Sequence, residues 1–519
     1  MNLTVLITTS GIGERLGNIT KYTNKSLVKV GDKYAICYII ECYDKQTEYI
    51  ITIGYYGNYV KEFLLLAYPD RNFTFVTIDK YCGLGSSLGY SLLQAKPYIN
   101  KPFIFHCCDA VIINNLEFVL NENTLYVCNY NNSIQYTNIT GQNNNVNQIN
   151  NKGAIDFDYI YIGICYIHNF NEFWENLQTL YINNANNSQL SDVDSFKLML
   201  NNNIKFKYKV INNWHDTGNI NSYNNLLQVI KPTYVVLEKN YESLCFIENK
   251  VIKFINDENI NNKRIIRGNN LFPLVPKIYN SGKNFIIMEL INGKLVSDIY
   301  QYNIIYKLLI WAKINLWINT DINDKYIDCC NRFYIKKTID RIQSLPFLND
   351  EKQIINGLNC INAIDIIRNI PINILTTNIF TQFHGDFILD NIIYTDNDNF
   401  KLIDWRHEFD NQLEYGDKYY DLAKLRHNII FNHKNITNKL FTIKIENDNV
   451  IVDLKCNYLL LQQLDDFDKF VIENKYNLYK IKILTSIIWL NMAPLYDGDL
   501  RFFLFYFGKY NLNIQYNNI

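Results

Sequence analysis

The sequence predicts two folds in one chain, an α/β domain over residues 1–228 and an α+β domain over residues 232–519. Over residues 1 to about 115, short apolar strands alternate with helical patterns, which indicates an open, mostly parallel sheet flanked by helices. Near Ile230-Lys231-Pro232 the pattern changes to alternating segments typical of antiparallel strands, and from about Ile304 it becomes mostly helical. A chain of 519 residues is too long for one core, which agrees with two domains.

The first half is expected to be Rossmann-like. Its early strands are predicted at residues 4–9, 49–53, 73–78 and 103–107, and its helices at 35–43, 60–67 and 87–94. The Asn- and Gln-rich stretch 129–152 predicts a loop or an irregular hairpin. A strand at 158–166, a helix at 172–180 and an edge-like strand at 204–211 follow.

The second half is expected to have a small strand-rich lobe over about 232–290 and a large helical lobe over about 291–519. Residues 243–248 and 250–255 are the first predicted strands. The region 384–405 interrupts the helical lobe and is predicted to form two short strands around a loop.

Composition restricts the class of protein. The chain is 48% hydrophobic and 15% aromatic, enough to build cores. Its net charge is −1 without a block of like charges, so neither nucleic acid nor a polybasic membrane anchor is an expected partner. No run approaches the ~20 apolar residues of a membrane span. The 12 cysteines lack metal-type spacing, and the adjacent pairs Cys107-Cys108 and Cys329-Cys330 have a poor geometry for structural disulfides, which favours a reducing, cytoplasmic location.

A phosphoryl-transfer motif occupies the second half. The stretch Phe383-His384-Gly385-Asp386-Phe387-Ile388-Leu389-Asp390-Asn391 is followed by Leu402-Ile403-Asp404-Trp405. Phosphoryl transfer needs a carboxylate to accept the proton of the attacking hydroxyl, and oxygen ligands to hold Mg²⁺ on the nucleotide. Asp386, Asn391 and Asp404 can divide that work.

Together with Gly416-Asp417 and Tyr420-Asp421-Leu422-Ala423, these residues resemble the choline kinase and aminoglycoside phosphotransferase family over about residues 232–510. The resemblance implies a bilobal, protein-kinase-like fold that uses ATP. It makes Asp386 the catalytic base, Asn391 and Asp404 the Mg²⁺ ligands, and Asp421 a brace for the catalytic loop.

The small lobe supplies three expected nucleotide-binding residues. Lys253, in Val251-Ile252-Lys253, matches the strand lysine that reaches the α and β phosphates. Glu258 is assigned as its partner because it is the only glutamate between Lys253 and Glu289. Met288-Glu289-Leu290 resembles the segment that binds adenine through its backbone. The alternative for Lys253 is an ordinary exposed strand lysine.

A second phosphate signature opens the chain. Leu6-Ile7-Thr8-Thr9-Ser10-Gly11-Ile12-Gly13-Glu14-Arg15 places a glycine turn after the first strand, and Lys25 follows. Small residues let backbone N–H groups approach phosphate oxygens, while Arg15 and Lys25 add neutralising charge. Asp109 ends a buried strand and Asp216 lies in Trp214-His215-Asp216-Thr217-Gly218, so two carboxylates could share one Mg²⁺.

Residues 1–228 resemble the sugar-phosphate and phosphocholine nucleotidyltransferases. The resemblance makes Gly11, Gly13, Arg15 and Lys25 the triphosphate grip, with Arg15 and Lys25 catalytic. Asp109 and Asp216 become the metal ligands, and Gly83 and Gly85 belong to a loop near the base. Glu14 departs from the Thr or Ser usual at its position, and a carboxylate there would repel a triphosphate by ~1 kcal/mol at 4 Å in water.

The roles of two acidic positions in this half stay open. Asp216 could be the N-cap of a helix over 217–227. Asp192-x-Asp194 could be a glycosyltransferase-type metal motif, although its place before a helical run favours an N-terminal helix charge.

The expected function is therefore bifunctional. The C-terminal domain would phosphorylate a small alcohol or sugar with ATP, and the N-terminal domain would couple the phosphomonoester to a nucleotide from a second NTP, CTP or UTP, with Mg²⁺ in both. The product would serve surface glycan or lipid headgroup biosynthesis, and the enzyme could be a homo-oligomer. The alternatives are a kinase with a non-catalytic N-terminal domain and a non-catalytic nucleotide-binding or assembly protein.

Overall fold

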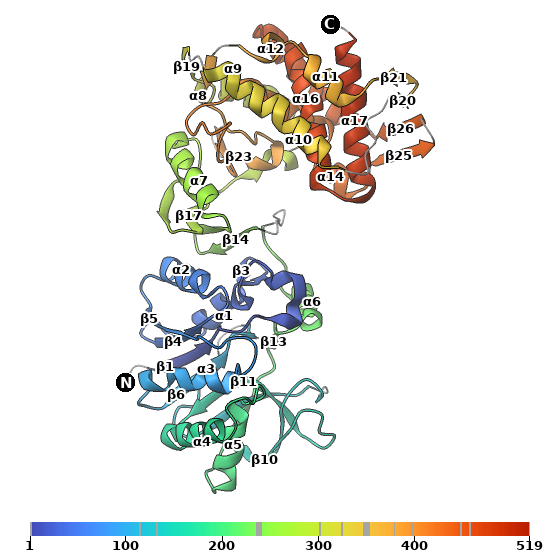
Figure 1. Cartoon of the computed structure of the whole chain (residues 1–519). Helices are drawn as coiled ribbons and strands as arrows, with labels where there is room; N and C mark the ends of the chain where they lie inside the picture. The colour runs from blue at the N-terminus through green and yellow to red at the C-terminus, as the bar shows by residue number, and fades with distance from the viewer. Residues whose placement is uncertain are drawn as a thin grey trace. The chain divides into compact units, whose positions relative to one another are not determined.

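The computed structural model describes residues 3–113, 116–130, 133–234, 241–299, 301, 303–322, 325–345, 353–377, 379–395, 399–446, 449–455 and 458–517. The chain divides into two compact units (Figure 1). The first comprises Met1–Glu258 and Tyr279–Met288, and the second Asn259–Ile278 and Glu289–Ile519. The division runs through the segment expected to form the small lobe.

A nine-stranded sheet forms the centre of the first unit, in the order β5-β4-β1-β6-β11-β8-β12-β10-β9. Its strands are β1 Thr4–Thr8, β4 Glu48–Ile53, β5 Asn72–Thr77, β6 Phe103–Cys107, β8 Thr124–Cys128, β9 Asn138–Gln142, β10 Asn145–Asn150, β11 Tyr159–Ile167 and β12 Lys207–Val210. Pairing is parallel from β5 to β6 and between β8 and β12, and antiparallel elsewhere. The sheet is therefore mixed rather than mostly parallel.

Helices cover both faces of this sheet because successive apolar side chains of its strands point to opposite faces, so that each face must be buried. Val5 and Ile7 of β1 face one core, which includes the helices α1 Ala35–Glu41 and α2 Gly57–Ala67. Leu6 faces the other core, against α3 Leu88–Ala95, α4 Phe170–Asn183 and α5 Asp192–Asn201 (Figure 1).

Two predictions in this half have clear outcomes. Residues 138–150 form the hairpin β9–β10, whose register shifts between Val146 and Gln148, as an irregular hairpin requires. The expected edge strand at 204–211 is wrong in position, because β12 lies inside the sheet between β8 and β10. The sequence of β12 is polar because most of its side chains are only half-buried, not because the strand lies at the edge of the sheet.

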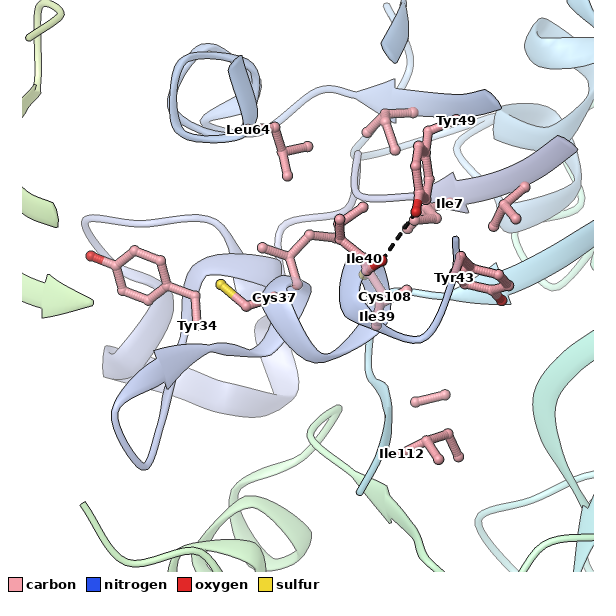
Figure 2. Close-up of a cluster of buried hydrophobic side chains, with 14 of the residues drawn as sticks. Ile7, Tyr34, Cys37, Ile39, Ile40, Tyr43, Tyr49, Leu64, Cys108 and Ile112 are labelled. Atoms are coloured by element: carbon pink, nitrogen blue, oxygen red, sulfur yellow. Dashed lines mark hydrogen bonds between the residues drawn. The ribbon is translucent and has the colours of Figure 1, made fainter. Parts of the chain in front are cut away.

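A second sheet, in the order β14-β15-β17-β16, belongs largely to the first unit. Its strands are β14 Glu242–Ile247, β15 Lys250–Ile255, β16 Ile278–Ser281 and β17 Phe285–Glu289. Cys245, Phe254 and Phe285 join the same core as Tyr34, Cys37 and Leu64 of the first domain. Figure 2 shows the latter three side chains within this core. Tyr34 Oη lies 2.6 Å from Ser243 Oγ. The sheet expected in the small lobe thus shares its core with the N-terminal domain.

Polar contacts also connect α2 to the turns of this sheet. Glu62 Oε1 accepts hydrogen bonds from the backbone N–H groups of Asn284 and Phe285 at 2.9 and 3.1 Å. Tyr59 Oη donates to Asn256 Oδ1 at 2.8 Å. These bonds satisfy backbone donors that the turn between β16 and β17 would otherwise leave unpaired.

The second unit is mainly helical. Its helices are α7 Glu258–Leu271, α8 Ile304–Asn315, α9 Lys325–Cys330, α10 Lys337–Gln343, α11 Ala363–Asn369, α12 Ile372–Leu375, α13 Lys418–Ile430, α14 His433–Thr437, α15 Tyr458–Glu473, α16 Leu478–Met492 and α17 Gly498–Tyr516. Helices α16 and α17 pack side by side (Figure 1). Among the helices described, none is long and apolar enough to span a bilayer.

Short strands interrupt these helices. They are β18 Lys294–Leu295, β19 Asn319–Ile322, β20 Gln353–Ile355, β21 Leu358–Cys360, β22 Ile379–Thr381, β23 Ile392–Thr395, β24 Asn399–Leu402, β25 Phe441–Glu446 and β26 Asn449–Leu454. Strands β23 and β24 are the two expected around the motif loop. The sheet β21-β20-β26-β25 was not expected, because β26 pairs with β20, about 95 residues earlier in the chain.

Candidate active sites

The first site begins at the carboxyl end of β1. Gly13 has a φ of 72° and precedes the 3₁₀ helix Glu14–Thr20, so the chain turns where a side chain would be strained. A Cβ on Gly13 would lie 3.0 Å from Thr20 Cγ2 and 3.1 Å from Lys25 Cβ, whereas one on Gly11 would meet open space. Gly11 therefore leaves room beside the strand end, and Gly13 permits the close approach of Lys25.

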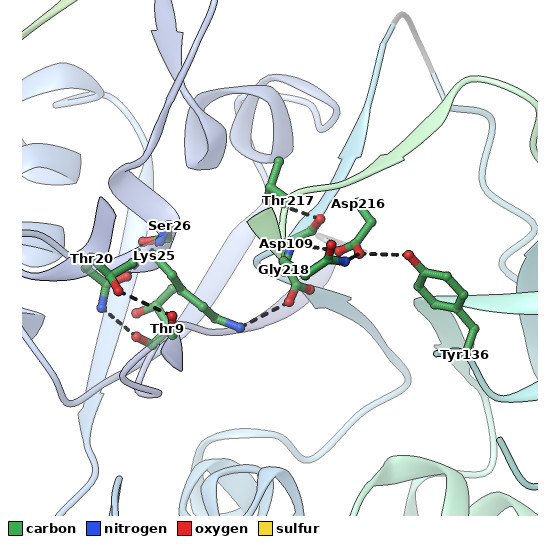
Figure 3. A network of polar contacts seen from close by, with 12 residues as sticks. Thr9, Thr20, Lys25, Ser26, Asp109, Tyr136, Asp216, Thr217 and Gly218 are labelled. Atoms are coloured by element: carbon green, nitrogen blue, oxygen red, sulfur yellow. Dashed lines mark hydrogen bonds and ion pairs between the residues drawn. The ribbon is translucent and has the colours of Figure 1, made fainter. Parts of the chain in front are cut away.

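Asn24 fixes Lys25 in place. Its buried side chain donates to Thr9 O at 2.8 Å and Tyr55 O at 2.6 Å, and its Oδ1 accepts from Ser26 N at 2.8 Å. These bonds attach the short 3₁₀ helix Lys25–Leu27 to the ends of two strands. Lys25 Nζ then reaches Asp109 Oδ2 at 3.2 Å (Figure 3).

Both candidate metal ligands face one small space. Asp109 follows β6, and Asp216 ends the strand β13 Trp214–Asp216, which pairs with β7 Ala110–Ile112. A Cβ on Gly218 would lie 2.7 Å from Asp109 Oδ2, 2.9 Å from Asp216 Oδ1 and 3.1 Å from Arg15 Nη2. Two carboxylates and the Arg15 guanidinium therefore converge at Gly218.

Hydrogen bonds orient Asp216. Its Oδ1 accepts from Gly218 N at 2.7 Å, and its Oδ2 accepts from Tyr136 Oη and Asn219 Nδ2, both at 2.8 Å (Figure 3). The cap of the following helix, α6 Ile220–Val229, is Asn219 rather than Asp216. The N-cap interpretation of Asp216 is therefore wrong.

The two carboxylates have opposite protonation tendencies. Burial would raise the pKa of Asp109, but the Lys25 ammonium holds that pKa below its usual value. Burial would likewise lower the pKa of Lys25, and the charge of Asp109 holds it well above its usual value. Burial, followed by the charge of Asp109, raises the pKa of Asp216. A further cation at this place would therefore relieve a real repulsion.

The donor set fits Mg²⁺, which prefers oxygen ligands and uses one or two carboxylates together with substrate phosphates. Asp109 and Asp216 would hold the ion. Among the described residues, no group of three or more acidic, His or Cys side chains is placed to hold a metal ion, so nucleotide oxygens and water would complete the shell.

Three aromatic rings lie beside Asp216, and we call them the aromatic corner: Tyr130, Tyr136 and Trp214. Their ring centroids are 5.4, 6.0 and 6.5 Å apart and their planes meet at 81–83°, so the three rings are nearly mutually perpendicular. Tyr130 is 45% exposed, which leaves the corner accessible from solvent.

The remaining first-unit predictions concern exposed positions. Gly83 and Gly85 have φ values of 76° and 82° and room for a ligand around Gly83. Glu14 is exposed in the first turn of its 3₁₀ helix. Asp192 and Asp194 begin α5, where Asp194 completes a capping box with Ser191, so the helix-start interpretation is confirmed.

The second site is the loop after β22. Asp421 of α13 accepts from the backbone N–H groups of His384 at 2.8 Å and Gly385 at 2.7 Å, the bracing contact that the family resemblance implies. The fully buried His384 places its Nε2 3.0 Å from Ile403 O, and burial lowers the pKa of His384 to about 4. A neutral His384 therefore supports the loop.

Asp386 and Asn391 contact each other directly. Asn391 Nδ2 donates to Asp386 Oδ2 at 3.1 Å, and Lys424 Nζ lies 2.7 Å from Asp386 Oδ1. Burial would raise the pKa of Asp386, yet the charge of Lys424 holds it below the ordinary value. Asp386 is thus ionised near neutral pH, as a proton acceptor must be.

A backbone hydrogen bond brings Asp404 close to Asn391, because the N–H of the preceding residue, Ile403, donates to Asn391 O at 2.9 Å. Its carboxylate is paired with Arg264 of α7, and its backbone φ is 53°. The amide oxygen of Asn391 and the carboxylate of Asp404 are suitable ligands for Mg²⁺, and they would hold the ion there.

The expected partner of Lys253 needs correction. Lys253 is buried and its Nζ lies 3.1 Å from Glu242 Oε2, across the hairpin β14–β15. Glu258 is instead half exposed, with an oxygen 3.7 Å from Lys283 Nζ. The assignment of Glu258 considered only glutamates that follow Lys253 in the sequence. The antiparallel pairing of β14 with β15 instead brings Glu242, which precedes Lys253, next to it. Glu289 Oε2 accepts from Lys277 N at 3.3 Å.

Sequence reasoning missed several residues that complete these sites. Asn24, Tyr136 and Glu242 orient Lys25, Asp216 and Lys253, and Lys424 and Arg264 neutralise Asp386 and Asp404. A usable signal existed only for Asn24, because it directly precedes Lys25 and a buried Asn commonly caps a short helix.

No family model matches the chain, and no curated protein matches it. Solved structures do match its N-terminal part. One is CTP:phosphocholine cytidylyltransferase from Streptococcus pneumoniae, at 20% identity over 44% of this chain and 100% of that chain, with a TM-score of 0.39. Another is a putative glucose-1-phosphate thymidylyltransferase from Bacillus anthracis, at 17% identity over 46% and 98%, with a TM-score of 0.38. A third is the inositol-1-phosphate CTP transferase from T. maritima, at 15% over 45% and 98%, with a TM-score of 0.35.

Proposed function

We propose that the chain is a bifunctional enzyme. The second unit phosphorylates a small alcohol or sugar with ATP, and the first transfers a nucleotidyl group from CTP or UTP to the phosphomonoester. The observation that carries the first activity is the convergence of Asp109, Asp216, Arg15 and Lys25 beside the glycine turn.

In the first reaction a phosphate oxygen of the phosphomonoester attacks the α phosphorus of the NTP. The bond from that phosphorus to the bridging oxygen breaks, and pyrophosphate leaves with the bond's electrons. Lys25 and Arg15 stabilise the negative charge on the phosphates, while Asn24 keeps Lys25 in position. Mg²⁺, when bound by Asp109 and Asp216, supplies Lewis-acid polarisation of the α phosphate.

In this proposal the alcohol part of the acceptor contacts the aromatic corner, because Tyr136 donates a hydrogen bond to Asp216. Aromatic faces bind both the C–H surfaces of sugars and alkylammonium groups. The corner therefore favours acceptors whose carbon skeleton presents a C–H surface to the rings, as a sugar does.

The second activity is supported by the contact between Asp386 and Asn391 and the adjacent Asp404. Asp386 accepts the proton of the attacking hydroxyl, whose oxygen forms a bond to the γ phosphorus of ATP as ADP leaves. Because one chain carries both activities, the phosphomonoester made by the second unit reaches the first unit at a raised local concentration.

The decisive test measures pyrophosphate release with four NTPs and a panel of phosphomonoesters that includes phosphocholine and glucose 1-phosphate. ADP release with the parent alcohols is measured beside it. Pyrophosphate release with one pair and ADP release with its parent alcohol is the expected result. ADP release alone would favour a kinase with a non-catalytic N-terminal domain, and Mg-ATP stabilisation without turnover would favour a binding protein.

A further inference from the structure

Four basic side chains of the second unit lie close enough to interact electrostatically, and we call them the cation cluster: Lys337, Arg341, Arg406 and Lys424. Lys424 is paired with Asp386 at 2.7 Å. Arg406 follows the Asp404-Trp405 motif, and its backbone N–H donates to His384 O at 3.1 Å. The catalytic loop therefore lies directly against two members of the cluster.

The buried ring of Phe333 contacts two members of the cluster. Lys337 Nζ lies 4.2 Å from the ring centroid and Arg406 Cζ 5.0 Å from it. Phe333 is itself fixed by Phe409, whose ring centroid is 4.3 Å away. Cation–π contacts of this kind hold two positive groups at one place without neutralising either of them.

Apart from Lys424, the members of the cluster lack a matching negative charge among the described residues. Arg341 Nη1 donates to Asn491 O at 3.0 Å and Arg406 Nε to Glu408 O at 3.0 Å, so both bind carbonyl groups. In the described part of the unit, neither these two nor Lys337 forms an ion pair. The carboxylate of Glu408 is already bound to Lys263 at 2.7 Å.

Burial and then the charges of Arg406, Arg341 and Lys424 lower the pKa of Lys337 to about 6. Concentrated positive charge in a partly buried place is unfavourable alone and becomes favourable when an anion enters. Lys337 also directly follows a π-helix, Asn331–Lys336, which contains Phe333. Such turns are rare and occur frequently at functional sites.

We propose that Lys337, Arg341 and Arg406 bind an anionic group, a carboxylate or a phosphate, on the alcohol that the second unit phosphorylates. This proposal rests on the proposed kinase activity. Guanidinium groups match the planar oxygens of such anions, and the charge of the bound anion favours protonation of Lys337, which then adds a point charge. The same cluster repels a quaternary ammonium, so it disfavours choline as the alcohol.

A binding experiment tests the site without turnover. The full chain, with both nucleotide sites filled by Mg²⁺ and non-hydrolysable ATP and CTP analogues, is titrated calorimetrically with sulfate. The wild type is expected to bind sulfate saturably, and Lys337→Met and Arg341→Met to bind it at least tenfold more weakly. The control is Arg332→Met, which removes an exposed arginine of the π-helix that precedes α10, where it is paired with Asp410. No saturable binding by the wild type, or equal weakening by the control, overturns the proposal.

A kinetic experiment tests the role. ADP release is measured with glycerol against glycerate, glucose against gluconate, and choline. The acidic member of a pair is expected to have the lower KM, and Lys337→Met should raise that KM at least tenfold while kcat and the KM for ATP stay unchanged. Preference for choline or the neutral alcohols overturns the anion role and leaves the kinase standing. Sulfate binding without ADP release from any alcohol would refute the kinase and keep the anion site.

Discussion

Replacement of Lys25 by methionine is expected to abolish most pyrophosphate release while leaving kinase activity intact. Lys25 Nζ lies 3.2 Å from Asp109 Oδ2, and the two side chains are 20% and 17% exposed. At an effective dielectric of about 20 these charges attract by about 5 kcal/mol. Most of that attraction offsets the cost of removing them from water, so the net loss of stability is about 1–3 kcal/mol. The lost contact to the phosphates should reduce kcat by about 10²–10³.

The assay compares pyrophosphate release from an NTP and a phosphomonoester with ADP release from the parent alcohol in one protein preparation. Lys33→Met is the matched control, because Lys33 also pairs with a carboxylate, Glu41 at 2.6 Å, but is more exposed. It should cost at most about 1 kcal/mol and no activity. If Lys25→Met kept pyrophosphate release within threefold of the control, the role given to Lys25 would be refuted.

Asp386→Asn should remove ADP formation by at least about 10²-fold while pyrophosphate release from a supplied phosphomonoester persists, and loss of both would show that the activities are not separable. Gly218→Ala puts a methyl group 2.7 Å from Asp109 Oδ2, so pyrophosphate release should fall by about 10²-fold, and full activity would contradict the convergence at Gly218. Burial lowers the pKa of His106 to about 4, whereas its pKa in the unfolded chain is about 6.5. The free energy of unfolding is therefore unaffected by His106 above pH 6.5 and is about 2 kcal/mol lower at pH 5, because the unfolded chain then binds a proton that the folded chain does not. His106→Gln should flatten this dependence in hydrogen exchange of the β6 amides, and an unchanged slope would argue against it.

The local parts of both sites could be predicted from sequence. The turn at Gly11 and Gly13 follows a five-residue apolar strand, and Asp109 follows another, so a strand-end phosphate site is visible in the pattern. Asp386, Asn391 and Asp404 lie within one short motif whose spacing is fixed by a loop and two strands. Such features depend on neighbours only a few residues apart.

Long-range pairing is where prediction failed. Strand β12 is interior although its pattern is polar, and Glu242 replaces Glu258 because an antiparallel hairpin reverses the chain. The sheet that joins residues 353–360 to 441–454 has no signal that matches one segment to the other. A periodic pattern indicates that a face is buried, but not which surface covers it.

By itself, the sequence determined where strands, helices and chemical motifs occur, because hydrophobic periodicity and turn chemistry act over a few residues. Only the tertiary structure decided that Arg15, Lys25, Asp109 and Asp216 meet at Gly218, and that Lys337 and Arg406 share the ring of Phe333. It also decided that strands β14, β15 and β17 complete the core of the first unit. The physical reason is that many segments of the chain offer surfaces of similar hydrophobicity, so the pattern cannot tell which two will meet. Close packing in the folded protein selects one partner for each buried surface.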